Sequence, residues 1–174
     1  KRSDTGIFGT SVTGKSHGVT LEGTPNGRKQ SFHYSLDTEF AMANLGGRGS
    51  RRQTLRYALM TDVNAPFPEF EVVLRAPNTH LKAKQVFAHP AHPTGVPEVD
   101  AALIVYSTDA RLAQLIGPLL VPLIGHNFVQ VVGRGQRLEM LADHATSSYA
   151  TYYLEDNAKL HHVLADAIER FAAG

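Results

Sequence analysis

Residues 53–63, QTLRYALMTDV, and residues 70–75, FEVVLR, are two runs in which apolar and polar residues alternate. In the second run the apolar positions are Phe70, Val72 and Leu74. A period of two, with aromatic and β-branched residues at the apolar positions, is typical of strands that bury one face. The connecting sequence, NAPFPE, is rich in turn formers. The stretch therefore predicts a long antiparallel hairpin at the centre of a sheet.

The upstream residues predict a second hairpin and an N-terminal arm. Residues 19–21 and residues 32–36 each alternate apolar and polar side chains. The Asn-Gly pair between them is a strong hairpin signal, because both residues accept positive φ angles. Residues 1–17 are rich in Gly, Ser, Thr and Lys, which is typical of a flexible arm or a weak strand. We therefore expect an arm over residues 1–17 and a single domain over residues 18–174.

Beyond residue 75 the pattern becomes a mixture of strands and helices. The apolar run AALIVY, residues 101–106, predicts a strand buried on both faces. Residues 107–109, Ser-Thr-Asp, are good N-cap residues for a helix over residues 110–116, which Gly117 and Pro118 end or kink. Further expectations are irregular structure over 76–99 with a strand at 83–86, an apolar turn or helix at 119–124, a hairpin of 128–132 with 137–141, and a last strand at 149–154.

The most regular pattern lies over residues 157–173 and predicts an amphipathic helix. His161 and His162 lie beside its apolar stripe, and one of them is expected to border the core, whereas Glu169 falls on the opposite face. Strands fill the first half of the chain and helices enter later. The expected fold class is therefore α+β, a mostly antiparallel sheet with helices, including this one, packed on one side. The apolar stripe consists of Leu160, Val163, Leu164, Ala167, Ile168 and Phe171.

The composition is that of one globular domain. The chain has 174 residues, of which 43% are apolar and 19% are charged. A formal net charge of +1 gives no reason to expect nucleic acid as a partner. The absence of cysteine excludes disulfides and thiolate zinc sites. No apolar run reaches the roughly 20 residues of a membrane-spanning helix. The chain opens on Lys1 rather than methionine, which suggests that it was taken from a longer protein.

Residues 9–16, GTSVTGKS, match the phosphate-binding pattern G-x-x-x-x-G-K-[ST]. In a working phosphate-binding loop a buried strand precedes the pattern and a helix follows it. Here KRSDTGIF precedes it and HGVTLEG follows it, so neither flank fits. We therefore expect no nucleotide site, and a small nucleotide-binding protein is the third choice of function.

The segment 80–92 holds the main candidates for metal binding. His89 and His92 are three residues apart, but a proline follows each of them, which argues against a helix that would present both imidazoles. Glu69 and Glu71 fall on the strand face that is expected to meet solvent, so they do not form an acid–base pair. We therefore assign no metal ligand, no catalytic residue and no cofactor.

Arginines gather in GGRGSRR, where Arg48, Arg51 and Arg52 form the candidate anion-binding site. Such a cluster can hold phosphate groups or lipid head groups, although a solvated loop is the simpler interpretation. No aromatic residues are interleaved with it, so nucleic acid is not expected. Arg51 also breaks the nearest match to the G-x-S-x-G motif of serine hydrolases, because it stands where the second glycine should be.

Three stretches resemble uncharacterised bacterial, largely actinobacterial, proteins. They are V-x-L-x-G-T-x-x-G-R-x-x-S-F-x-Y (residues 19–34), RQTLRYALMTDVNAPFPEFEV (52–72) and D-A-x-x-x-V-x-S-x-D (100–109). Proteins of that family often carry a membrane-spanning N-terminal region before a soluble domain. The resemblance implies an upstream membrane anchor, and it carries over no activity, cofactor or site residue.

These observations favour a non-catalytic soluble binding or scaffolding domain, with a protein as a partner to consider. The resemblance adds attachment to a membrane by a segment outside this sequence, and the cytoplasmic side is one option for its location. The alternative is a metal-assisted hydrolase that uses the His-rich segment 80–92.

Overall fold

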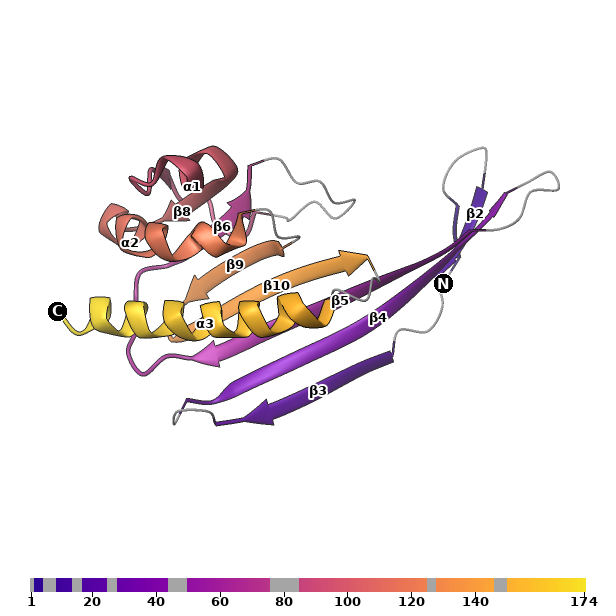
Figure 1. The fold of residues 1–174 in the computed structure, drawn as a ribbon, viewed down its shortest axis with the longest axis horizontal. Helices are drawn as coiled ribbons and strands as arrows, with labels where there is room; N and C mark the ends of the chain where they lie inside the picture. Colours follow the sequence, from indigo (N-terminus) through magenta and orange to yellow (C-terminus); the bar gives the residue numbers. More distant parts are fainter. Residues whose placement is uncertain are drawn as a thin grey trace.

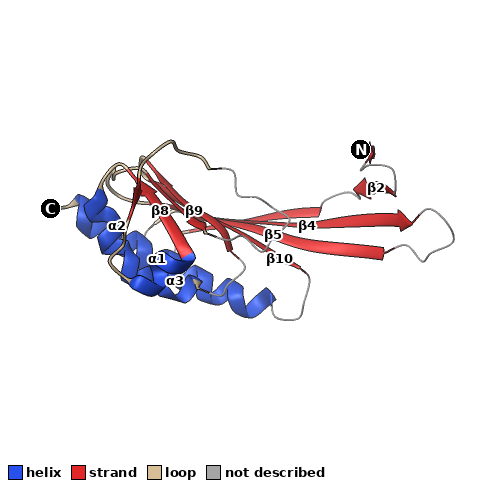
Figure 2. Ribbon diagram, turned by 90° about the horizontal axis from the view of Figure 1, so that it is seen from above, coloured by secondary structure: helices blue, strands red, loops and turns tan. Residues whose placement is uncertain are grey.

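The structure, a computed structural model, describes residues 2–4, 9–13, 17–24, 28–43, 50–75, 85–124, 128–145 and 150–174. Its strands form one sheet of ten strands in the order β1-β2-β4-β5-β10-β9-β6-β8-β7, with β3 also paired to β4. All of these pairs are antiparallel. The helices lie on one face of the sheet (Figures 1 and 2). The predicted α+β class is confirmed.

The elements have the following bounds. The strands are β1 (Arg2–Asp4), β2 (Gly9–Thr13), β3 (His17–Gly23), β4 (Gln30–Ala43), β5 (Ser50–Asp62), β6 (Phe70–Leu74), β7 (Ala91–His92), β8 (Leu103–Ser107), β9 (Phe128–Arg134) and β10 (Arg137–Ala145). The helices are α1 (Pro97–Ala102), α2 (Ala110–Ile116), the 3-10 helix η2 (Gly117–Leu123) and α3 (Ala150–Ala172).

The predicted hairpin of residues 53–75 is wrong, although both of its strands exist. β5 and β6 are separated in the sheet by β10 and β9. The link between them crosses the tip of the β9–β10 hairpin, where Val63 N donates to Gln136 O (2.7 Å) and Phe67 N donates to Gly135 O (3.1 Å). Gly135 turns this tip tightly with a φ of +62°, which glycine adopts without strain. Alternation identified each strand and its buried face, but it says nothing about which strand lies beside it.

The upstream hairpin is confirmed, because β3 pairs antiparallel with the first half of β4. The expected turn residues 25–27 lie outside the described residues. β2 pairs with the second half of β4, and β1 pairs with β2. Residues 2–4 and 9–13 are therefore strands within the stretch for which an arm or a weak strand was expected. β4 and β5 extend well beyond the helices and carry β1 and β2 at their far end (Figure 1).

The C-terminal helix and most of its buried stripe are confirmed, but α3 begins earlier and Val163 does not belong to the stripe. The predicted last strand at 149–154 is wrong, because residues 150–154 form the start of α3. Val163 is 43% exposed, whereas Asn157 and His161 are buried together with Leu160, Leu164 and Ile168. His161 borders the core, as expected for one of the two histidines, whereas the burial of Asn157 was not expected.

The face assigned to Glu169 was also wrong. Glu169 accepts hydrogen bonds from Arg28 Nε (2.9 Å) and from Asn64 N (3.0 Å), and Arg28 also pairs with Asp166 (2.6 Å). Arg28 is only 11% exposed. The hydrogen bond from the Arg28 guanidinium, with smaller help from Asn64, lowers the pKa of Glu169. These contacts tie α3 to the residues before β4 and after β5, so this side of the helix is an attachment surface.

The core lies between the sheet and the helices. Phe70 and Val72 are fully buried as predicted, and Leu74 packs against the same core. Phe171 also packs against it but is only partly buried, with the Arg111 guanidinium 5.7 Å from its ring centroid. The core therefore joins β6 to α3, as the two periodicities predicted.

The apolar run at 101–106 does not form a strand buried on both faces. Its first residues belong to α1, which begins at Pro97 and carries Glu98 and Asp100 in its first turn. Pro at the start and acidic residues in the first turn both favour a helix N-terminus. β8 then alternates, with Leu103, Val105 and Ser107 buried.

The predictions for the segments that flank η2 are confirmed. Asp109 caps α2 by accepting a hydrogen bond from Arg111 N, and α2 spans residues 110–116. The η2 turn follows at Gly117, and β9 and β10 form the expected hairpin. Among the described residues, no helix has both the length and the apolarity needed to cross a membrane.

Candidate functional site

The sheet has a second face, which the helices do not cover (Figure 2). Along β6, β9 and β10 the buried residues Val72, Val131 and Met140 face the helices, so their neighbours in sequence point the other way. Strand pairing places these neighbours side by side, because Val132 lies opposite both Glu139 and Glu71. We call this surface the helix-free face. It includes Glu71, Gln130, Val132, Glu139 and Leu141.

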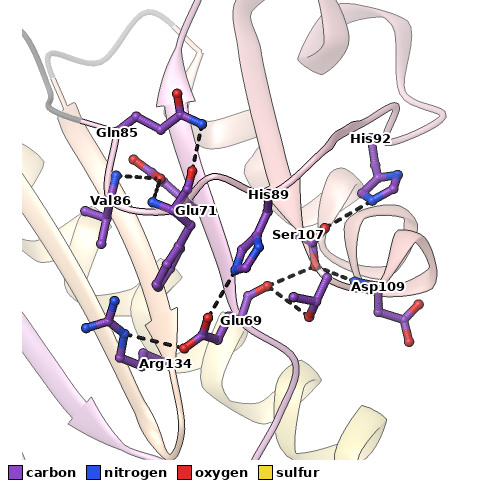
Figure 3. Close-up of polar contacts among 11 residues, drawn as sticks. Glu69, Glu71, Gln85, Val86, His89, His92, Ser107, Asp109 and Arg134 are labelled. Atoms are coloured by element: carbon purple, nitrogen blue, oxygen red, sulfur yellow. Dashed lines mark hydrogen bonds and ion pairs between the residues drawn. The ribbon is translucent and has the colours of Figure 1, made fainter.

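Glu71 fixes a loop segment, residues 85–90, over this face. The Glu71 carboxylate is fully buried. Its Oε2 accepts hydrogen bonds from Val86 N (2.9 Å) and Phe87 N (3.1 Å) (Figure 3). Its Oε1 accepts one from the side-chain amide of Gln130. Three donors therefore satisfy a buried carboxylate that has no cationic partner among the described residues.

The expectation that Glu69 and Glu71 meet solvent together is therefore wrong. β6 lies inside the sheet rather than in a two-stranded hairpin, and the segment 85–90 covers the side chain of Glu71. Glu69, just before β6, is only partly exposed and makes its own contacts with other partners. The two carboxylates have separate structural roles.

Glu69 contacts the side chains of His89 and Arg134. His89 Nε2 lies 3.1 Å from Glu69 Oε2, and Arg134 Nε lies 3.5 Å from Glu69 Oε1 (Figure 3). The Arg134 guanidinium also lies 4.7 Å from the ring centroid of Phe87, which stacks on His89 with centroids 4.9 Å apart. A cation over an aromatic face is attracted by the ring quadrupole. The carboxylate of Glu69 and the ring of Phe87 therefore both fix the position of Arg134.

A pocket of about 220 Å³ opens on the helix-free face beside these contacts. Val86, Val132 and Leu141 supply its apolar wall. Arg134 and Arg137 lie directly opposite each other on β9 and β10 at its rim, and their side chains are 61% and 59% exposed. The remaining lining residues are Gln130 and Glu139.

Each arginine at this rim contacts a carboxylate of the protein through its Nε atom. Arg137 Nε donates to Asp62 Oδ1 at 3.1 Å, as Arg134 Nε faces Glu69. No hydrogen bond or ion pair to their terminal nitrogens occurs within the described part of the chain. Like charges directly opposite each other on neighbouring strands are destabilising unless something compensates them. The rim therefore presents two guanidinium groups that can donate to an anion.

Ser107, His92 and Asp109 lie close together but are not arranged as a hydrolase triad. His92 Nε2 lies 3.1 Å from the backbone oxygen of Ser107, not from its hydroxyl. The Ser107 Oγ donates to Glu69 O (3.1 Å) and accepts from Asp109 N (3.1 Å). A nucleophilic serine needs the imidazole on its hydroxyl. This cluster instead connects β8 to the start of α2 and to the residue before β6 (Figure 3).

The structure describes the sequence-predicted sites only in part. Of the candidate anion site, Arg51 and Arg52 lie on β5, opposite Phe40 and Glu39 of β4, and Arg48 lies outside the described residues. The side chains of Arg51 and Arg52 also lie outside the description, so this site stays a prediction.

The two histidines of the candidate metal segment contact different groups. His89 contacts a carboxylate, and His92 contacts a backbone oxygen. In the ranges that the structure describes, no group of three or more His, Cys, Asp or Glu residues is placed to hold a metal ion. Residues 80–84 lie outside those ranges.

The first residues of the phosphate-binding pattern, residues 9–16, form a strand, and another strand follows the pattern. Residues 9–13 form β2, and β3 begins at His17. Residues 14–16, which contain the Gly-Lys-Ser sequence, lie outside the described residues. The absence of a nucleotide site therefore stays a prediction.

Sequence reasoning missed the pocket. Its residues come from β9, β10 and the segment that follows β6, and only pairing in space unites them. The available signal was Gln130, a polar residue in the otherwise apolar run FVQVV, together with Glu71, a polar residue in the strand FEVVL. No protein-family model, curated protein or solved structure matches this chain.

Proposed function

We propose that this chain is a non-catalytic binding module and that the pocket on the helix-free face is its ligand site. The observation that carries this proposal is the cross-strand pair of Arg134 and Arg137, whose exposed guanidinium groups border an apolar wall. Each side chain is held at Nε by a carboxylate, and no described residue binds the terminal nitrogens, which can therefore donate to a ligand. Guanidinium groups bind carboxylates in a bidentate geometry.

The ligand that fits this chemistry carries a carboxylate next to a branched aliphatic group. The carboxylate accepts hydrogen bonds from Arg134 and Arg137, and the aliphatic group packs on Val132 and Leu141. The C-terminus of a peptide that ends in an aliphatic residue has this composition. The proposed partner is therefore a protein tail, in keeping with a binding or scaffolding role.

The charge balance of the site predicts a weak interaction. Two arginines are offset by Asp62, Glu69 and Glu139, so no strong positive potential draws an anion in from a distance. We expect a dissociation constant of about 1 mM for a single amino-acid analogue, equivalent to roughly −4 kcal/mol. A longer peptide gains affinity by extending along the helix-free face.

The contacts of Ser107, His89 and His92 support the non-catalytic part of the proposal. The Ser107 hydroxyl is held by backbone groups, and the two imidazoles contact different acceptors. The alternative metal-assisted hydrolase has no support from these contacts. Attachment to a membrane by a preceding segment remains an expectation that rests on the sequence resemblance.

The test is a pair of NMR titrations that follow backbone amide shifts. N-acetyl-leucine carries the carboxylate, whereas N-acetyl-leucinamide has the same side chain without the charge. With ligand up to about 10 mM, ten times the expected dissociation constant, only N-acetyl-leucine should shift the amides of Val132, Arg134, Arg137 and Glu139.

The double variant Arg134→Gln, Arg137→Gln should lose these shifts. The matched control is Arg170→Gln, because Arg170 is also exposed but lies on α3, on the other side of the sheet. Equal responses to the two compounds, or no response of the pocket amides to either, would contradict the proposed function.

A further inference from the structure

A histidine lies in the interface between α3 and the sheet. His161 is fully buried, and its Nδ1 is 2.9 Å from the Oγ1 of Thr61 on β5. Thr61 in turn accepts a hydrogen bond from the side-chain amide of Gln30 on β4 (3.1 Å). Thr61 is itself buried, at a position of β5 where alternation places an apolar residue. The helix therefore meets the sheet here through a chain of polar groups.

The other ring nitrogen of His161 has no such support. The buried Nε2 has no hydrogen-bond partner in the described residues, and the same is true of Nδ1 of the neighbouring His162. A protonated imidazole needs both nitrogens to donate. A positive ring at this position would therefore be a buried charge with no carboxylate to pair with among the described residues, which is strongly unfavourable.

No described charged group faces His161 to compensate it. β5 presents Thr61, β4 presents Gln30, and β10 presents the backbone of Leu138. The buried residues of α2 and η2 are apolar side chains and a glycine. On α3 itself, His162 is the adjacent titratable group and adds repulsion when charged. Arg28 pairs with Asp166 and Glu169 further along the helix, so these charges are engaged with one another rather than with His161.

We infer that acidification releases α3 from the sheet, because His161 can accept a proton only when the helix undocks. Release exposes the stripe of Leu160, Leu164 and Ile168, so the helix changes from a core element to a free amphipathic segment. The docked helix is the form near neutral pH, and mild acid shifts the population toward the released form.

The pH range follows from the histidine itself. Burial, followed by the charge of His162, lowers the pKa of His161 to about 3, with a smaller opposing effect of the Leu138 backbone. In the released helix the pKa returns to its ordinary value of about 6.5. Each opening then takes up one proton between these values. The opening equilibrium therefore rises about tenfold per pH unit below pH 6.5, or roughly thirtyfold at pH 5.

The test combines two NMR measurements on the whole chain. Hydrogen exchange of α3 amides, corrected for the intrinsic pH dependence of exchange, should show protection factors that fall roughly fifteenfold between pH 6.5 and pH 5. In His161→Gln this extra fall should disappear, whereas it should persist in His33→Gln, because His33 is exposed on β4.

The second measurement needs only the wild-type chain and stands if His161→Gln does not fold. The imidazole carbon and proton shifts of His161 should keep their neutral values as long as the α3 amides are protected, and should change together with the loss of protection. A ring that becomes protonated while the α3 amides stay protected would overturn the inference. An equal fall in protection in the wild type and in a folded His161→Gln would do the same.

Discussion

Replacing Glu71 by glutamine tests how the pocket wall is held in place. The change keeps the shape of the side chain and removes its charge. In the structure, Oε2 accepts from Val86 N and Phe87 N, and Oε1 accepts from the Gln130 amide. A glutamine oxygen can replace Oε2, but its NH₂ group would meet the NH₂ group of Gln130 unless that amide turns over.

The magnitude follows from the loss of charge on these bonds. A hydrogen bond to a charged group contributes about 1.5–3 kcal/mol, against about 0.5–1.5 kcal/mol for a neutral one. Two backbone bonds each weaken by about 1–1.5 kcal/mol on these figures, so Glu71→Gln should lower the free energy of unfolding by roughly 2–3 kcal/mol. Glu71→Ala should lower it further, because all three donors lose their acceptor.

Denaturant unfolding and hydrogen exchange measure this effect. The unfolding midpoint should fall in Glu71→Gln, and the amides of Val86 and Phe87 should exchange faster than those of β8. The control is Glu22→Gln, because Glu22 is exposed on β3. A stability within about 0.5 kcal/mol of the wild type, with both amides still protected, would refute the role assigned to Glu71.

Three further predictions concern α3. The pKa of His161 is lowered to about 3 in the folded state, so the stability that the neutral, buried ring provides is complete well above pH 6.5 and is lost as the pH falls. Unfolding midpoints should therefore show about 2 kcal/mol less stability at pH 5 than at neutral pH. If His161→Gln loses as much stability between the two pH values, His161 is not the cause. Arg28→Ala should lower the free energy of unfolding by about 1–3 kcal/mol, because it leaves the partly buried Glu169 without its cation. A double-mutant cycle with Glu169→Gln should show that the two effects are coupled rather than additive. Leu164→Ala should lower the free energy of unfolding by about 2–5 kcal/mol, whereas Val163→Ala should change it by no more than about 0.5 kcal/mol. Equal losses of stability in denaturant unfolding would mean that the helix docks by another face.

The local features of the fold could be predicted because short patterns determine them. Asp109 before an apolar periodic stretch predicted α2, and the Gly-Arg-Gly tip predicted the β9–β10 hairpin. Alternation correctly identified Phe70 and Val72 as core residues. For the helix and the hairpin the deciding contacts lie within a few residues of one another in sequence, and for the strand the alternation alone marks the buried face.

The strand order and the burial of polar residues could not be predicted in this way. The β9–β10 hairpin, more than fifty residues downstream of β6, inserts between β5 and β6. Glu71 is buried because the segment 85–90 crosses it, and His161 is buried because Thr61 lies opposite on the sheet. The pattern indicated that one of His161 and His162 borders the core, but its partner, Thr61, follows only from the packing of α3 on the sheet.

The candidate site depends on these same long-range contacts. Arg134 and Arg137 flank a short turn, and their opposition could be expected from the hairpin alone. The apolar wall at Val86 depends on the buried carboxylate of Glu71, which the sequence pattern places on the solvent face. The predicted arginine cluster at residues 48–52 and the pocket are therefore separate candidates for anion binding.

A crystal structure of the chain with N-acetyl-leucine tests the central claim most directly. We predict that the ligand carboxylate lies between the terminal nitrogens of Arg134 and Arg137, with the leucine side chain on Val132 and Leu141. The same crystals soaked with N-acetyl-leucinamide should leave the pocket without this ligand. A carboxylate bound elsewhere while the two arginines stay open to solvent, or the amide bound equally well in the pocket, would contradict the account.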